Sequence, residues 1–395
     1  MTNEQALTYM HNLLRGMLEK KASDLFISAD FPPAMKIDGK MTPVSQSKLT
    51  GEYTKAFAEA LMDEKQRADF AKEKECNFAI YPADIGRFRV NVFVQQEKVG
   101  MVLRTITTKI PNIDELGLPE VLKEVMMTKR GLVILVGGTG SGKSTTLAAL
   151  IDYRNQNSYG HIITVEDPVE YVHASKNCLI THREVGRDTN GWFNALKNTL
   201  RQAPDVILIG EIRDRETMEF ALAFAETGHL CMATLHANSS NQALDRIINF
   251  FPEERHAQLH MDLSLNMRAF ISQRLVSKTG GGRAAAIEIL LNSPLIQDLI
   301  LKGETNMIKE AMAKSAELGM QTFDQALFNL CEEGRITQED ALRNADSVNE
   351  LRLRFKLHGK NAGGKAAESK GPSLSLHEEP KKEEPEQAEN PLAKF

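Results

Sequence analysis

The stretch that decides the fold runs from Gly137 to Thr145 and reads GGTGSGKST. It has the spacing G-x-x-x-x-G-K-[ST] of a phosphate-binding loop. Glycines let the backbone curl closely around an anion, and the peptide N–H groups that begin the next helix favour negative charge. Lys143 can reach the β- and γ-phosphates of a nucleotide, and the Ser144 hydroxyl can bind Mg²⁺. The loop residues expected to bind the nucleotide are Gly138, Thr139, Gly140, Ser141, Gly142, Lys143, Ser144 and Thr145.

The segments that flank this loop have the pattern that the motif requires. An apolar run, GLVILV, precedes it and is typical of a buried strand, whereas Thr145–Tyr153 has helical spacing. Strands then alternate with helices, which indicates an α/β domain with a mainly parallel sheet. The strands are predicted at Leu132–Val136, His161–Val165, Val206–Ile209 and Leu230–Leu235.

The remaining elements of this half are predicted from spacing and composition. One long helix is expected over Pro252–Val276, because apolar residues recur at helical spacing from Leu259 to Leu275. A further strand is expected at Ala284–Leu291. Residues 120–292 then form the core of the domain, 293–357 a C-terminal helical region, and 358–395 an acidic tail. That tail has almost no large apolar residues, so we expect it to be disordered.

A smaller α+β domain is expected before the loop, over residues 1–106, with a linker at 107–119. Asp38-Gly39 is a strong hairpin signal between two short strands. The helices are predicted at 4–20 and 53–72, and the strands at 24–28, 34–37, 40–44, 76–81, 87–95 and 99–105.

Composition narrows the class of protein. The 395 residues carry a net charge of −5, which does not favour duplex nucleic acid as the main partner. The four cysteines are far apart and contain no C-x-x-C pair, which argues against a cysteine-built zinc site. Neither a membrane-spanning apolar run nor a signal peptide is evident, so a cytoplasmic protein is expected.

Acidic residues follow two of the predicted strands. Glu211 comes after Val206–Ile209 and Gly210, where it could hold the water shell of a metal or polarise the attacking water. Glu166, Asp167 and Glu170 follow His161–Val165, and one of them could orient or deprotonate water. The alternatives are a strand-end acid that faces solvent and an acidic loop that caps a helix.

Histidines and arginines complete the set of candidate residues. His229 and His236 flank the strand LCMATL and are an odd number of residues apart, so they point to opposite faces of an ideal strand. Arg87 and Arg89 share one face of a strand in the small domain, and Arg104 lies on the next strand. These arginines either form a solvated face or point at a phosphate chain across an interface.

Four motifs occur in a fixed order: GGTGSGKSTT, ITVEDPVEYVH, RQAPDVILIGEIRD and ETGHLCMATLHA. In order and form they resemble the Walker A, Asp box, Walker B and His box motifs of type II/IV secretion and pilus ATPases. Over residues 1–355 the chain looks closest to the PilT/PilU family of type IV pilus retraction motors, and within it to the PilU branch. It begins directly with the small domain, and it lacks the leading domain and zinc-binding cysteines of assembly ATPases.

The resemblance implies a PAS-like N-terminal domain and a RecA-like P-loop ATPase domain with a helical C-terminal part. It also implies a homohexamer that hydrolyses ATP with Mg²⁺ and docks on a PilC-type inner-membrane platform protein. Glu170 matches the catalytic glutamate of the Asp box and Glu211 that of Walker B. Lys143 is the phosphate-loop lysine, and Ser144 and Glu211 are the metal-binding candidates. The remaining matches are the His-box residues His229 and His236, and arginines that reach a neighbour's ATP, namely Arg87, Arg89 and Arg104.

One segment departs from the retraction family. The retraction motif AIRNLIRE of PilT is replaced by PLIQDLILKGE at Pro294–Glu304. This departure favours an accessory motor that acts with a PilT-type ATPase. Three alternatives stay open: an assembly ATPase, a ring-forming partner with weak ATPase activity, and a nucleic-acid translocase, which the net charge makes the least favoured.

Overall fold

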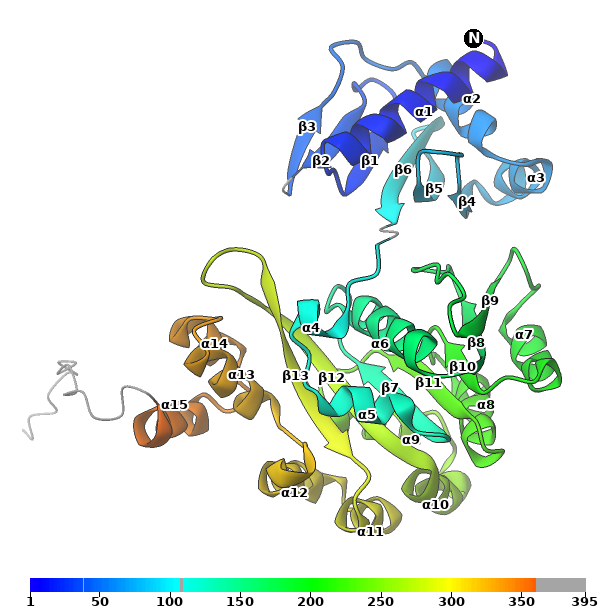
Figure 1. Ribbon diagram of the computed structural model, residues 1–395. Coiled ribbons are helices and arrows are strands. Elements are labelled where there is room, and N and C mark those ends of the chain that lie inside the picture. Colours follow the sequence, from blue (N-terminus) through cyan, green and yellow to red (C-terminus); the bar gives the residue numbers. More distant parts are fainter. Residues whose placement is uncertain (38, 107–108, 360–395) are drawn as a thin grey trace, which may run out of the picture.

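The computed structural model describes residues 1–37, 39–106 and 109–359, which form two sheets with their own helices. Figure 1 shows the smaller sheet domain above the larger one. Asp38 of the predicted hairpin turn and residues 360–395 of the predicted tail lie outside the described residues. This arrangement is the predicted α/β architecture with a small α+β domain at its start.

The small domain is an antiparallel six-stranded sheet with the order β3-β2-β1-β6-β5-β4. Helix α1 is capped by Thr2, whose side chain accepts the N–H of Gln5, and it buries Ala6, Met10 and Leu14 against the sheet. The elements are α1 Asn3–Glu19, β1 Asp24–Ile27, β2 Ala34–Ile37, β3 Lys40–Pro43, α2 Gly51–Leu61, α3 Glu64–Glu73, β4 Glu75–Ile80, β5 Arg87–Gln95 and β6 Lys98–Ile106. The predicted single helix over 53–72 is wrong, because Asp63 caps a new helix with its side chain on the N–H of Gln66.

The larger domain has a seven-stranded sheet with the order β13-β12-β7-β11-β10-β8-β9. All neighbours are parallel except β12 and β13. Its strands are β7 Gly131–Val136, β8 Gly160–Glu166, β9 Cys178–Glu184, β10 Val206–Ile209, β11 Leu230–Leu235, β12 Met267–Ser277 and β13 Arg283–Leu291. Its helices are α4 Ile113–Leu116, α5 Val121–Met127, α6 Lys143–Asn157, α7 Trp192–Thr199, α8 Arg215–Glu226, α9 Ser240–Asn249 and α10 His256–Asn266.

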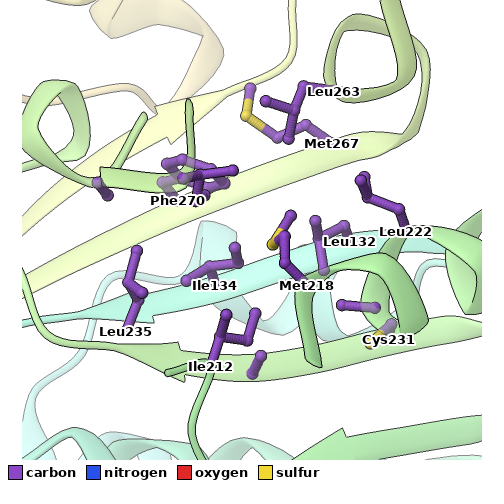
Figure 2. Close-up of a cluster of buried hydrophobic side chains, with 14 of the residues drawn as sticks. Leu132, Ile134, Ile212, Met218, Leu222, Cys231, Leu235, Leu263, Met267 and Phe270 are labelled. Atoms are coloured by element: carbon purple, nitrogen blue, oxygen red, sulfur yellow. The ribbon is translucent and has the colours of Figure 1, made fainter. Parts of the chain in front are cut away.

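Both faces of this sheet are covered, as the continuous apolar strands require. Strand β7 is buried along its whole length. Its residues Leu132 and Ile134 pack on the face covered by α7 to α10, where Figure 2 shows them with Met218 and Phe270. Its residue Val133 points the other way, into the core beneath α5 and α6. This double burial fixes β7 and therefore the loop that follows it.

The predicted helix over Pro252–Val276 is wrong in its second half. Helix α10 ends at Asn266, and Met267–Ser277 is strand β12. One edge of β12 pairs with β7 and the other edge with β13 over nine residue pairs. The spacing of a short apolar run fits a buried helix and a buried strand equally well. Pairing with β7 and β13, and not the local pattern, therefore determines that this segment is a strand.

Two further differences concern segments around the core. Strand β9 is not among the predicted strands, because CLITHRE has neither an apolar run nor a clean alternation. The stretch predicted as a linker contains the short helix α4, which Asn112 caps with its side chain on the N–H of Glu115.

The C-terminal helices follow β13 and confirm the helical prediction for this region. They are α11 Pro294–Lys302, α12 Ile308–Lys314, α13 Phe323–Glu332, α14 Gln338–Asn344 and α15 Val348–His358. Phe323 and Leu327 of α13 pack against Ala284 and Ala286 of β13, so these helices lie beside the β12–β13 edge of the sheet. Within the described part of the chain, no helix combines the length and apolar character that crossing a membrane requires.

Candidate nucleotide-binding site

The phosphate-binding loop joins β7 to α6 in the strand–loop–helix order that its motif requires. Gly142 has φ of +89°, and a Cβ there would lie 2.7 Å from Gln273 Nε2. A Cβ on Gly137 would lie 2.8 Å from the carbonyl oxygen of Gln273. Both positions therefore require glycine, because β12 passes directly behind the loop.

Lys143 begins α6 and is nearly buried. Its Nζ donates to the carbonyl oxygens of Gly137 at 2.6 Å and Gly138 at 3.0 Å. Burial lowers the pKa of Lys143, while the Glu211 carboxylate opposes this shift. The ammonium group is held inside the loop, where an anion such as a phosphate would meet it.

A cleft of about 430 Å³ lies beside the loop, at the carboxyl ends of β8, β10 and β11. This is where open parallel sheets bind their ligands. The loop contributes Thr139, Gly140, Lys143 and Ser144 to it. A second cavity of about 590 Å³ adjoins the loop and is lined by Ser141, Gly142, Thr145 and the apolar side chains of Leu116 and Leu275.

Glu211 enters the cleft from the end of β10. Gly210 lets β10 approach β8 closely, because a Cβ there would lie 3.1 Å from the Cα of Glu166. The carboxylate of Glu211 accepts from Arg213 Nε at 2.7 Å, and its Oε1 lies 3.3 Å from His236 Nε2. Burial, and after it the nearby Lys143 charge, lowers the pKa of His236 and so favours its neutral ring. Arg213 and His236 thereby position the Glu211 carboxyl group in the cleft.

The acids that follow β8 reach the same cleft. Glu166, Asp167 and Glu170 all line it, and Glu170 is exposed toward it. Glu166 is buried, and its Oε2 accepts the N–H of Glu170 at 3.3 Å. Burial raises the pKa of Glu166 from 4.5 to about 7. The Asp box therefore offers one exposed carboxylate, Glu170, and one buried carboxyl, Glu166, that is partly protonated near neutral pH.

Strand β9 holds the segment that carries Glu170. Glu184 Oε2 accepts the N–H of Val169 at 3.1 Å, and His182 Nε2 accepts the N–H of His173 at 3.0 Å. The other nitrogen of His182 lies 2.9 Å from the Thr164 hydroxyl. Because Nε2 accepts, Nδ1 carries the proton toward Thr164. The Asp-box segment is therefore fastened to side chains on the strand that sequence analysis does not predict.

The three arginines predicted to reach a nucleotide divide into two kinds. Arg89 and Arg104 are exposed, face each other across β5 and β6, and line the cleft. Arg104 Nε donates to Asp24 Oδ1 at 2.8 Å. Arg87 is 3% exposed, does not line the cleft, and pairs with Glu184 of its own chain at 2.9 Å.

The two histidines are not brought together. His236 follows β11 and lines the cleft, whereas His229 precedes β11 and bonds to Thr227 and to the carbonyl of Phe224. Several lining residues of the cleft were not predicted from the sequence, and four of them carry large polar or aromatic side chains. These four are Tyr171, His173, Trp192 and Arg213. Three of them lie within three residues of a predicted acid, so sequence proximity to the strand ends was the signal available.

The comparisons with known proteins agree with this geometry. The family model described as type II/IV secretion system protein matches residues 3–343. The chain belongs to this family. PilU, a type IV pilus ATPase of Pseudomonas aeruginosa, is 60% identical over 346 residues, which cover 87% of this chain and 91% of PilU. PilT, a type IV pilus retraction ATPase of the same species, is 44% identical over 333 residues, which cover 84% of this chain and 97% of PilT.

A solved structure of this family also matches the fold. The crystal structure of the pilus retraction motor PilT with bound ADP has a TM-score of 0.81 and 40% identity, and covers 87% of this chain and 98% of that chain. The predictions of the retraction-ATPase family, of its ATP hydrolase activity and of the α/β fold class are confirmed. The roles of individual residues, including the action of the arginines on a neighbouring subunit, stay predictions.

Proposed function

We propose that this chain binds ATP at the Gly137–Thr145 loop and hydrolyses it in the adjoining cleft. The observation that carries the proposal is the convergence of a phosphate-binding loop with Glu170, Glu211 and the two arginines Arg89 and Arg104 in one cleft. Phosphoryl transfer is catalysed mainly by positioning and by charge stabilisation. The cleft provides cations that can bind phosphates and carboxylates that can orient water.

Mg²⁺ fits the residues of this cleft. Ser144 and Glu211 offer a hydroxyl and a carboxylate in the same cavity, which are hard oxygen donors. Within the described residues no cluster of three acidic, histidine or cysteine side chains could form a complete protein cage. Mg²⁺ is usually held by one or two protein oxygens together with phosphates, so a complete cage is not required. When bound, the ion would neutralise charge on the phosphate oxygens.

Each protein group has a distinct task in the proposed reaction. Lys143 binds the phosphate chain from within the loop, and Glu170 accepts a proton from the attacking water as general base. Glu211, held by Arg213 and His236, orients water at the opposite side of the cleft. Arg89 and Arg104 stabilise negative charge on the transferred phosphoryl group. The adjoining cavity with Leu116 and Leu275 accommodates the base and ribose.

We further propose that the chain drives pilus retraction as a hexameric accessory motor at the cytoplasmic side of the inner membrane. Its partners would be a PilT-type ATPase and a PilC-type platform protein. The similarity to the type IV pilus ATPase PilU over most of both chains supports a pilus motor. The accessory role rests on the sequence PLIQDLILK of helix α11, which replaces the retraction motif of PilT.

The direct test is pilus retraction and twitching motility in cells that carry this chain alone, a PilT-type motor alone, or both. The proposal predicts little retraction with this chain alone and stronger retraction with both than with the PilT-type motor alone. The Lys143→Ala variant should lose the added effect. Full retraction by this chain alone would contradict the accessory role, and equal support by the Lys143→Ala variant would contradict an ATP-driven one.

A further inference from the structure

Arg87 lies where the small domain meets the ATPase domain, and the structure buries it there. It is the first residue of β5, and its Nη2 donates to Glu184 Oε2 at 2.9 Å across 97 residues of sequence. Glu184 is the last residue of β9 and is also buried. The ion pair therefore joins the two domains within one chain.

The same carboxylate oxygen of Glu184 also binds the Asp-box segment. It accepts the N–H of Val169 at 3.1 Å, and Val169 immediately precedes Glu170. One oxygen atom thus contacts an arginine of the small domain and the peptide next to the general base. A movement of the small domain that withdraws Arg87 would leave Glu184 without its cation. The Glu184 carboxylate, which binds the Val169 N–H, would then be free to move.

The buried Arg87–Glu184 ion pair is not well suited to stabilising the folded chain. The Nε and Nη1 of Arg87 are buried and have no hydrogen-bond partner among the described residues. Its guanidinium carbon lies 4.4 Å from the centre of the Tyr81 ring, and Arg187 of the ATPase domain lies 4.7 Å from the same ring. Burying a guanidinium group with unsatisfied donors costs free energy, and buried ion pairs are weak evidence for stability. The pair is better suited to fixing a relative position.

We propose that the Arg87–Glu184 ion pair acts as an intrachain latch. When the small domain packs against the ATPase domain, the pair holds the Val169 peptide, and with it Glu170, in the position needed for hydrolysis. Arg87 and Glu184 are positioning residues, because they act through the Val169 peptide and not on the nucleotide. The latch rests on the proposed ATP hydrolysis. It assigns Arg87 to its own chain, in contrast to the action on a neighbour that the sequence predicts for this arginine.

The first test combines turnover with amide exchange. Arg87→Ala and Glu184→Gln should each lower kcat by about 10- to 100-fold, as expected for a misplaced catalytic group, with the Kd for ATP changed less than about threefold. The double variant should be no slower than the slower single variant, because both changes break one pair. Arg87→Lys should recover part of the rate. Additive losses, or a loss of ATP affinity equal to the loss of kcat, would overturn the latch.

Hydrogen exchange gives a readout that does not depend on turnover. The Val169 and Glu170 amides should exchange faster in Arg87→Ala than in wild type, while the Gly137–Thr145 loop keeps its exchange rate. The control is Lys98→Ala, which removes the Lys98–Asp30 ion pair at the surface of the same domain and should change neither readout. Unchanged exchange around Glu170 in folded Arg87→Ala would overturn the proposal. If wild type hydrolyses no ATP, the proposed function fails, and the exchange result still decides the latch.

Rings that mix two variant subunits distinguish an Arg87 that acts within its own chain from one that acts on a neighbouring subunit. Arg87→Ala and Lys143→Ala subunits each carry a defect in their own site if Arg87 acts within its chain. Verified mixed rings should then show no recovery of ATPase activity. Recovery would mean that Arg87 of one subunit completes the site of the next, and it would overturn the latch.

Discussion

The two walls of the nucleotide cleft are built in different ways. The phosphate-loop wall comes from one continuous segment, and its lysine is held by carbonyl groups of that same segment. The opposite wall gathers Glu170, Glu211 and His236 from three strand ends, and Arg104 from another domain. The first wall is local and the second is assembled by tertiary packing. This difference suggests that the first wall binds the nucleotide and that the second controls its cleavage.

The largest effect is expected in the phosphate-loop wall. Lys143→Ala removes the charge that the loop holds for the phosphates, so ATP turnover should fall by about 10³-fold or more and ATP affinity should fall with it. The fold should persist, because the change removes a buried cation and buries nothing new. Turnover, ATP binding and the circular dichroism spectrum provide the check, with the surface variant Lys302→Ala as control. Normal turnover in folded Lys143→Ala would contradict the assignment of this loop as the nucleotide-binding site.

A smaller effect is expected from Arg104 in the assembled wall. Arg104→Ala should lower turnover by about 10²- to 10³-fold, in the range of arginine groups that act on phosphoryl transfer. Asp24→Asn breaks the same ion pair but keeps the guanidinium group, and it should retain most of the activity. Because Arg104 lines the cleft of its own chain, mixed rings of Arg104→Ala and Lys143→Ala should stay inactive, whereas partial recovery would show the action on a neighbouring subunit that the sequence predicts. No recovery in verified mixed rings would count against action across the interface.

The smallest effect is a pH dependence of stability at Glu166. Burial raises the pKa of this carboxyl from 4.5 to about 7, so the folded state binds a proton that the unfolded state has released. The stability that the neutral form provides is complete below pH 4.5 and is lost as the pH rises through about 7. Glu166→Gln keeps a neutral oxygen that can accept the Glu170 N–H. Its melting temperature should match wild type near pH 4.5 and exceed it by a few degrees at pH 8. An equal difference at both pH values would contradict the assignment.

The difference between a local wall and an assembled wall also explains which parts of the fold and the site could be predicted from the sequence. The phosphate loop could be predicted residue by residue, because motif, strand and helix follow one another along the chain. The strand at Met267–Ser277 could not, since its pairing with β7 and β13 overrides a helical spacing. The support of Glu170 by β9, and the burial of Arg87, depend on which surfaces dock. Hydrophobic periodicity carries no information about which surfaces dock, so the sequence predicts the residues of the assembled wall but not their contacts.

Glu170→Gln tests the division of labour between the walls most directly. The measurement is the nucleotide that remains bound after incubation with ATP and Mg²⁺, together with the Kd for ATP and the turnover rate. We expect Glu170→Gln to bind ATP within about threefold of wild type, to turn over roughly 10²-fold more slowly and to retain uncleaved ATP, because the loop is intact and the base is absent. Loss of ATP affinity in proportion to turnover, or bound ADP at the wild-type level, would contradict it.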